Sequence, residues 1–207
     1  GLGGAGRHPL PGGGCGRFAL KAQTAVSGGT IGLSAVNLDL DGNTAEGVLT
    51  FATDGRQTLQ GTLAAEELDL TPYVSTVRLL TNNERDWNRV PIALEGLTGF
   101  DLDLRLSAAR ITMARAKLGR TAVAANLRGG KLTVTIGEAQ AFGGIVKGSI
   151  VLASSDIGAE LRSQMQFTDV DLENSLGELF NFRRVEGRGN MALEIDAAGG
   201  SVLALTR

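Results

Sequence analysis

The stretch that decides the fold is Gly47-Val48-Leu49-Thr50-Phe51-Ala52, because its pattern returns about a hundred residues later as Gly148-Ser149-Ile150-Val151-Leu152-Ala153. Each copy is followed by a turn and by a second run in which apolar residues alternate with others, at residues 59–65 and 161–167. Both second runs end on an acidic residue, an aliphatic residue, Asp and Leu, at residues 67–70 and 169–172. A repeated hairpin predicts an architecture built from strands, and such repeats usually form extended surfaces.

The same alternation recurs along most of the chain. It is clearest where Phe100, Leu102 and Leu104 alternate with Asp101 and Asp103, and it is typical of antiparallel strands with one buried side. Turn signals rich in glycine separate the runs at residues 41–42, 54–55, 128–130 and 142–144. We therefore expect strands near residues 17–25, 30–41, 44–53, 57–69, 98–112, 118–128, 130–141, 145–153, 157–168 and 184–197.

Few stretches favour helix. Thr71-Pro72 predicts one helix start, residues 171–181 predict a second helix with Asp171 as its N-cap, and a third could begin at Ser201. Residues 1–16 are rich in Gly and Pro and are expected to be disordered, whereas residues 74–97 lack periodicity and are expected to form a link. The chain thus predicts one β domain over residues 17–207, with halves at 17–73 and 98–207, cut off at the C-terminus inside an apolar stretch.

The size of the expected sheet constrains its shape. Ten strands at a spacing of about 4.8 Å make a sheet roughly 48 Å wide, and two helices about 15 Å long cover little of it. An uncovered flat apolar face of that size would cause aggregation. We therefore predict a mainly β fold: a wide, curled antiparallel sheet, open as a groove or closed in part as a barrel, with two or three short helices.

Composition and charge argue against several classes of function. A net charge of −2 argues against nucleic acid as a partner, because that binding needs a basic face. No run of 18 apolar residues is present, so we expect no segment of this chain to span a membrane. The single Cys15 cannot form an internal disulfide and does not indicate a compartment.

The sequence contains no constellation of reactive side chains, so we expect no enzyme, no catalytic residue, no metal and no cofactor. The only histidine, His8, has no Cys or carboxylate nearby to build a metal site or a triad. Residues 1–6 read GLGGAG, but no strand precedes them, as dinucleotide binding requires. Asp101 and Asp103 could bind Ca²⁺ weakly, although solvated charges on a strand are the commoner case. Trp87 is either a ligand or membrane contact or, as we favour, a loop anchor.

Several short stretches, in order, resemble the C-terminal region of the AsmA-like proteins of Gram-negative bacteria. They are residues 68–73 (LDLTPY), 87–92 (WNRVPI), 99–104 (GFDLDL), 118–119 (LG), 127–132 (LRGGKL), 141–144 (AFGG) and 167–172 (FTDVDL). The resemblance covers roughly residues 30–207, and Phe142 stands where the family often has Tyr. It implies a periplasmic protein that is anchored to the inner membrane when full-length, contacts the membrane through segments absent here, and is linked to outer-membrane biogenesis. Larger relatives of the TamB and YhdP type imply a β-groove through which phospholipid passes between the membranes.

These observations leave three hypotheses. The first is an apolar β-groove whose partners are phospholipid acyl chains, and the second is an assembly scaffold in which the same face packs on further repeats of the full-length protein. An enzyme acting on a sheet surface is the third and least favoured. The expected lining of the groove consists of apolar residues on the alternating runs: Phe100, Leu102, Leu104, Leu132, Val134, Ile136, Ile150, Leu152, Leu161, Met165, Phe167, Met191, Leu193 and Ile195.

Overall fold

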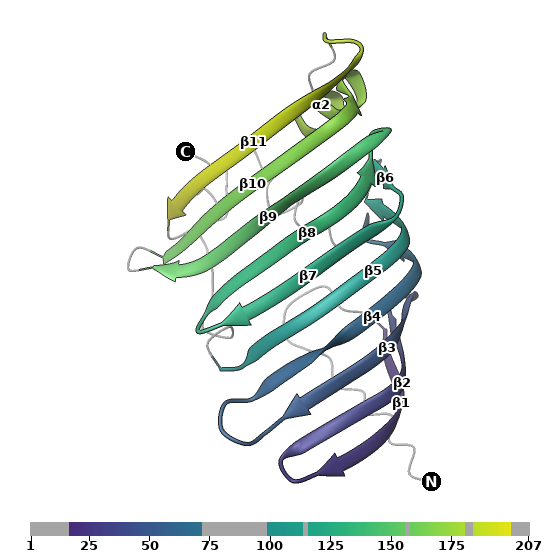
Figure 1. Ribbon diagram of the computed structural model, residues 1–207, viewed down its shortest axis with the longest axis vertical. Coiled ribbons are helices and arrows are strands. Elements are labelled where there is room, and N and C mark those ends of the chain that lie inside the picture. The colour runs from purple at the N-terminus through teal and green to yellow at the C-terminus, as the bar shows by residue number, and fades with distance from the viewer. Residues whose placement is uncertain (1–16, 72–98, 114–115, 156–157, 181–183, 200–207) are drawn as a thin grey trace.

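The computed structural model describes residues 17–71, 99–113, 116–155, 158–180 and 184–199, which form one sheet of eleven strands with a single helix beside it (Figure 1). The strands are β1 (Phe18–Ser27), β2 (Thr30–Leu40), β3 (Asn43–Ala52), β4 (Thr58–Asp69), β5 (Asp101–Met113), β6 (Ala116–Leu118), β7 (Thr121–Arg128), β8 (Lys131–Ala141), β9 (Gly144–Ser155), β10 (Gly158–Asp171) and β11 (Arg188–Gly199). The helix is α2 (Leu172–Phe180). Strands neighbour one another in chain order, except that the short β6 pairs only with β5.

All ten expected strands are present, and the sheet is not closed, so the fold is the open groove and not the barrel. The strand expected at residues 118–128 is divided at Gly119 into β6 and β7. The helix expected at residues 171–181 is confirmed as α2, with Asp171 as its N-cap, since Asp171 Oδ1 accepts a hydrogen bond from the Asn174 N–H at 2.9 Å. The expected helices that follow Thr71 and begin at Ser201, the loose segment 1–16 and the link 74–97 lie outside the described residues.

One pair of neighbouring strands departs from the expected antiparallel arrangement. Strands β4 and β5 run parallel, with Leu59 beside Leu102 and Leu63 beside Leu106, whereas every other described pair is antiparallel. A tight hairpin must reverse the chain, but the long connection between Asp69 and Asp101 can return it to the opposite end of the sheet. The alternation of apolar residues is the same in either direction, so the sequence pattern did not indicate this junction.

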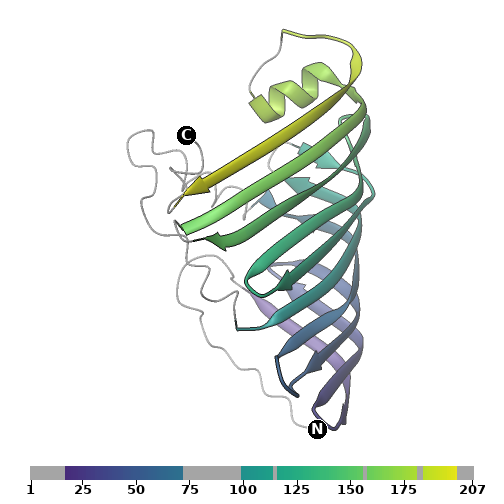
Figure 2. The same ribbon diagram turned by 60° about the vertical axis from the view of Figure 1, so that its left-hand side comes forward.

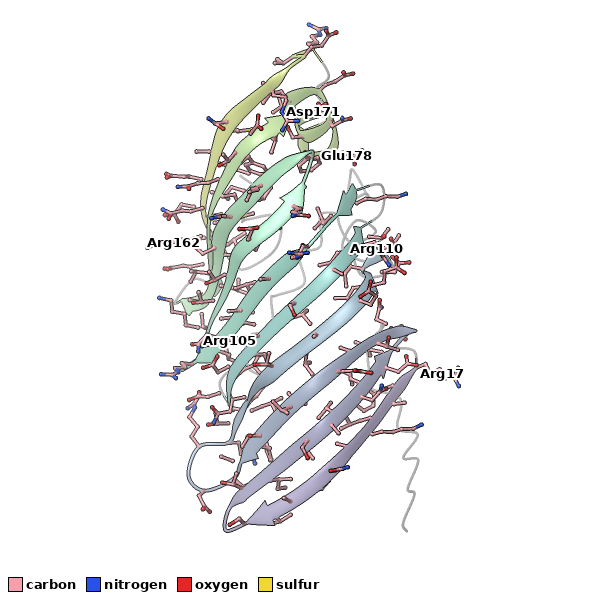
Figure 3. All side chains as sticks on the ribbon, turned by 45° about the vertical axis from the view of Figure 1, so that its right-hand side comes forward. Arg17, Arg105, Arg110, Arg162, Asp171 and Glu178 are labelled. Carbon is pink, nitrogen blue, oxygen red and sulfur yellow. The ribbon has the colours of Figure 1, made fainter. Side chains whose placement is uncertain are left out.

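The strand register aligns the apolar residues of all long strands on one face. Residues that are paired across neighbouring strands form three lines over this face, which we call ladders. Each ladder is listed in strand order and starts at β1 or β2 and ends at β11. The first consists of Val26, Ile31, Phe51, Leu59, Leu102, Leu127, Leu132, Leu152, Leu161 and Ala197. The second consists of Thr24, Leu33, Leu49, Gly61, Leu104, Ala125, Val134, Ile150, Ser163 and Ile195. The third consists of Val36, Gly47, Leu63, Leu106, Val123, Ile136, Gly148, Met165 and Leu193. The helix α2 lies on the concave side of the curled sheet (Figure 2). The ladders face the same side, because Arg105 and Arg162, the chain neighbours of Leu104 and Leu161, project from the convex side (Figure 3).

Most of the best-buried apolar residues form a line along one rim of the concave face, and Leu127, which is 1% exposed in the first ladder, is the exception. Register shifts interrupt the pairing between Leu33 and Val36, between Ile136 and Ala139, and between Phe167 and Val170. Each register shift marks a β-bulge, where one strand contains an extra residue. A bulge bends the strand and increases its twist, so neighbouring strands fold inward near the same rim. Three clusters are buried there, centred on Val36 with Leu63, on Ala108 with Ile111, and on Phe167 with Val170. This rim is the main core of the fold, while the rest of the concave face is less covered except at Leu127 and Ser163.

Candidate functional site

The concave face is free of charge over the described strands. None of its three ladders contains Asp, Glu, Lys or Arg, and its polar members are Thr24 and Ser163. Charged residues make up 20% of the chain, so they are segregated to other surfaces. Arg105 and Arg162, for example, project from the convex side (Figure 3). A one-sided surface of this kind contacts apolar material well and offers no groups for acid–base chemistry.

Most of the residues expected to line a groove do share the concave face and keep part of their surface accessible. Those that are half-buried are Leu102, Leu104, Leu132, Val134, Ile136, Ile150, Leu152, Leu161, Met165, Met191 and Leu193. Ile195 on β11 remains 41% exposed. Phe100 is half-buried but directly precedes β5 and is not a strand residue.

The expectation for Phe167 is wrong in one respect. Its side chain is only 4% exposed and packs in the rim cluster with Val146 and Val170, so it belongs to the core. The register shift that follows it brings Val170 onto the same face and covers the ring. Alternation alone assigned Phe167 to the correct face but did not indicate how deeply that part of the face is covered.

Sequence reasoning also missed the first half of the concave face. Strands β1 to β4 contribute Leu33, Leu49, Phe51 and Leu59 to the same ladders as the expected lining. The alternation of apolar residues could have identified this part of the face, because residues 30–40 and 47–65 show the same pattern as the expected lining. The face is therefore continuous from the first strand to the last, and both repeat copies extend it.

Two glycines occupy equivalent positions in the repeat and bring neighbouring strands unusually close. Gly47 is paired with Leu63, and Gly148 is paired with Met165. A Cβ atom at Gly148 would overlap the Gln164 carbonyl oxygen and would lie 2.6 Å from Met165 Sδ and 2.9 Å from Met165 Cα. A Cβ atom at Gly47 would overlap the Thr62 carbonyl oxygen and lie 3.0 Å from Leu63 Cα. Both positions therefore require glycine, and both set the local curl of the concave face.

The acidic residue near the end of each repeat is held by an arginine from the following strand. Glu67 on β4 accepts from Arg110 Nε on β5 at 2.7 Å, and Asp169 on β10 accepts from Arg188 on β11 at 2.8 Å and 2.9 Å. Arg188 also donates to the carbonyl oxygens of Asp169 and Gly143 at 2.7 Å and 2.9 Å, so it joins β11 to β10 and to the turn between β8 and β9. The hydrogen bond from Arg188 lowers the pKa of Asp169, and the bond to Glu67 raises the pKa of Arg110. These pairs fasten the rim and leave the concave face uncharged.

A second aspartate near the end of each repeat accepts a hydrogen bond from the backbone that follows it. Asp69 Oδ1 accepts a hydrogen bond from the Thr71 N–H at 2.9 Å, just as Asp171 caps α2. Hydrogen bonds from the Thr71 side chain and backbone lower the pKa of Asp69. Both copies therefore end on an aspartate whose side chain accepts a backbone N–H, two residues on in the first copy and three residues on in the second. The next long strand nevertheless pairs in parallel in the first copy and antiparallel in the second.

The rims carry polar hollows that do not select one kind of ligand. A hollow of about 370 Å³ beside α2 is lined by the cations Lys117 and Arg188 and by the acids Asp171 and Glu178. Within the described ranges, no group of three or more His, Cys, Asp or Glu residues is arranged to hold a metal ion. The described part of the chain also lacks a helix long and apolar enough to cross a membrane.

Comparisons with protein-family models, with curated proteins and with solved structures found no match to this chain. The resemblance to the AsmA-like proteins therefore stays a prediction. The candidate site is defined by its own geometry: a charge-free, partly exposed concave face that runs across ten paired strands of one open sheet.

Proposed function

We propose that this chain binds phospholipid acyl chains along its concave face and performs no catalysis. The observation that carries the proposal is that the ladders contain no charged residue while most of their large side chains are only half-buried. Apolar surface left partly accessible on this scale favours an apolar ligand or partner. The face is wide and shallow, which suits a flexible chain better than a rigid small molecule.

The hydrophobic contributions to binding are small for each group but large when added together, and none of them fixes the position of the ligand. Each methylene group removed from water contributes about 0.8 kcal/mol, or roughly 25 cal/mol per Å² of apolar surface. About nine spacings of about 4.8 Å separate the axes of the two outer strands, so these axes lie roughly 43 Å apart, which exceeds the hydrocarbon core of a bilayer at about 30 Å. Because no charged group on the ladders fixes one position, a bound acyl chain can move along the face. The same surface therefore supports both holding and conducting lipid.

The cellular setting of the proposal comes from the resemblance alone. It implies a non-enzymatic role in envelope biogenesis, in the periplasm, with phospholipid passing between the inner and outer membranes. The geometry is consistent with that role, because the face is open at the side and is not a closed cavity sized for one ligand.

The test uses Leu104→Glu and Val134→Glu, which place carboxylates on the second ladder with only Ala125 between them. Arg105→Glu is the matched control, because Arg105 neighbours Leu104 on β5 but is exposed on the convex side. We expect the wild type and the control to retain phospholipid in native mass spectrometry and to take up a fluorescent phospholipid from vesicles. The double variant should stay folded by circular dichroism and lose both signals. The proposal is wrong if the wild-type protein neither retains phospholipid in native mass spectrometry nor takes up the fluorescent phospholipid.

A structural scaffold is the second candidate, and the buried rim favours it. Val36 is 2% exposed and Val170 is fully buried, so part of the concave face already serves as core. If the face is mainly packing surface, the Leu104→Glu and Val134→Glu variant should unfold and the wild type should bind no lipid. Loss of folding together with lipid binding by the wild type would instead show that one surface has both roles.

A further inference from the structure

The two outermost strands of the sheet have one unpaired side each among the residues that the structure describes. Strand β1 begins the strand order and β11 ends it. Open strand edges present backbone N–H and C=O groups that can pair with another chain, and natural proteins usually protect them with charges, proline or bulges. The residues of each edge strand therefore indicate whether that edge is protected against pairing with another strand.

Strand β1 exposes large apolar side chains toward the concave side. Phe18 is 66% exposed, Leu20 is 43% exposed and Val26 is 70% exposed. Their partners on β2 are the apolar residues Leu40, Leu38 and Ile31, so the apolar pattern continues up to the edge and is interrupted there only by Thr24. An uncovered edge of this kind favours an additional strand that also carries apolar residues on the concave side.

Strand β11 has the features that such an additional strand needs. Its concave side presents Met191, Leu193 and Ile195, and its convex side presents Glu194 and Asp196. The convex side of β1 carries Lys21, whose charge is opposite. Asp196 already pairs with Arg162 at 3.5 Å, so Glu194 is the acid that we expect to face Lys21.

The strand directions also fit. The parallel β4–β5 junction makes β1 and β11 point the same way, so β11 of one molecule would meet β1 of another in a parallel pair. The sheet already contains one such pair, and ion pairs join both of its ends: Arg56 with Asp101 at 2.6 Å and Arg110 with Glu67 at 2.7 Å.

We propose that β11 of one copy pairs in parallel with β1 of a second copy, head to tail, so that two concave faces join into one longer face. Placing Leu20 beside Leu193 also places Lys21 beside Glu194, because both strands alternate in the same register. The proposal does not depend on lipid, since the two sheets join through backbone bonds, apolar contacts and this charge pair. A single strand pair is a small interface, so the association is weak and concentration-dependent.

The test uses two variants that each block one edge with an inward-pointing lysine. Val26→Lys blocks β1 and Ile195→Lys blocks β11, and both original side chains are exposed, so both proteins should fold as judged by circular dichroism. Sedimentation velocity from about 1 µM to about 1 mM should show chains of increasing length for the wild type and monomers for each variant alone. A mixture of the two variants should give only a 1:1 dimer, because one open β1 and one open β11 remain.

Exchanging the charges at residues 21 and 194 tests whether Lys21 and Glu194 face each other in the mixed dimer. Lys21→Glu, added to the Ile195→Lys protein, should weaken the mixed dimer several-fold, and Glu194→Lys in the other protein should restore it. Dimers of the Ile195→Lys protein alone would show symmetric β1–β1 pairing, and dimers of the Val26→Lys protein alone would show β11–β11 pairing. Either result, or a wild type that stays monomeric at every concentration, would overturn the proposal whether or not the concave face binds lipid.

Discussion

The glycine at position 148 offers the sharpest test of how the concave face is built. A Cβ atom there would overlap the Gln164 carbonyl oxygen and lie 2.6 Å from Met165 Sδ and 2.9 Å from Met165 Cα. Two of these three atoms belong to the backbone of the paired strand, so β9 and β10 must separate in Gly148→Ala. Overpacking of this kind costs about 1–3 kcal/mol, and we expect a value near the upper end because backbone cannot rotate away.

The assay is thermal unfolding followed by circular dichroism. For a domain of this size, each kcal/mol shifts Tm by roughly 2–4 °C, so Gly148→Ala should lower Tm by roughly 4–12 °C. Gly47→Ala should have a similar effect, because Gly47 holds the equivalent place in the first repeat and meets the Thr62 carbonyl oxygen.

Gly32→Ala is the matched control, since its new Cβ atom would lie 3.7 Å from the Ala25 carbonyl oxygen, an ordinary contact. Restricting the unfolded chain should then stabilise the control by about 0.4–1 kcal/mol. If Gly148→Ala and Gly32→Ala unfold at the same temperature, the added methyl group does not force β9 and β10 apart. That result would contradict the requirement for glycine at position 148.

Two further predictions concern the rim. Asp171→Ala removes the oxygen that caps α2 at the Asn174 N–H and should cost about 1 kcal/mol, measured as a lower Tm, whereas Asp171→Asn should keep most of the stability. The hydrogen bond from Arg188 lowers the pKa of Asp169, so this pair stabilises the fold above the usual Asp pKa of about 3.9 and is lost as the pH falls through the lowered value. Asp169→Asn should therefore lower Tm at pH 7 but have a shrinking effect below about pH 4, and an effect that stays constant with pH would contradict this role. Asn is the suitable replacement because residue 169 has a φ of 51°, which Asn tolerates.

Much of the local structure could be predicted from the sequence. Alternation with a period of two located all ten long strands, and the glycine-containing pairs located the hairpin turns, because these signals depend only on near neighbours. The N-cap role of Asp171 was equally local. The repeat also predicted equivalent positions correctly, since Gly47 and Gly148 both lie opposite an apolar residue in the third ladder.

Other features could not be obtained from local patterns. The Glu67–Arg110 and Asp169–Arg188 pairs join residues 43 and 19 positions apart, and nothing in the sequence marks these charges as partners among many others on polar strand faces. The burial of Phe167 depends on a register shift that slides Val170 over the same face. Such shifts follow from the way neighbouring strands twist against each other, and that depends on the whole sheet.

The sequence by itself determined that this protein is a sheet of repeated hairpins with one apolar side, because strand periodicity and turn chemistry are encoded residue by residue. Only the tertiary structure decided that β4 and β5 run parallel, that all apolar sides meet on one concave face, and that both outer strands point the same way. Pairing direction and sheet closure depend on contacts between distant segments, and the alternation pattern is compatible with either choice. The repeat that begins at Gly47 and Gly148 predicted a surface, and the sheet's curl and register made that surface a continuous, uncharged and partly open face.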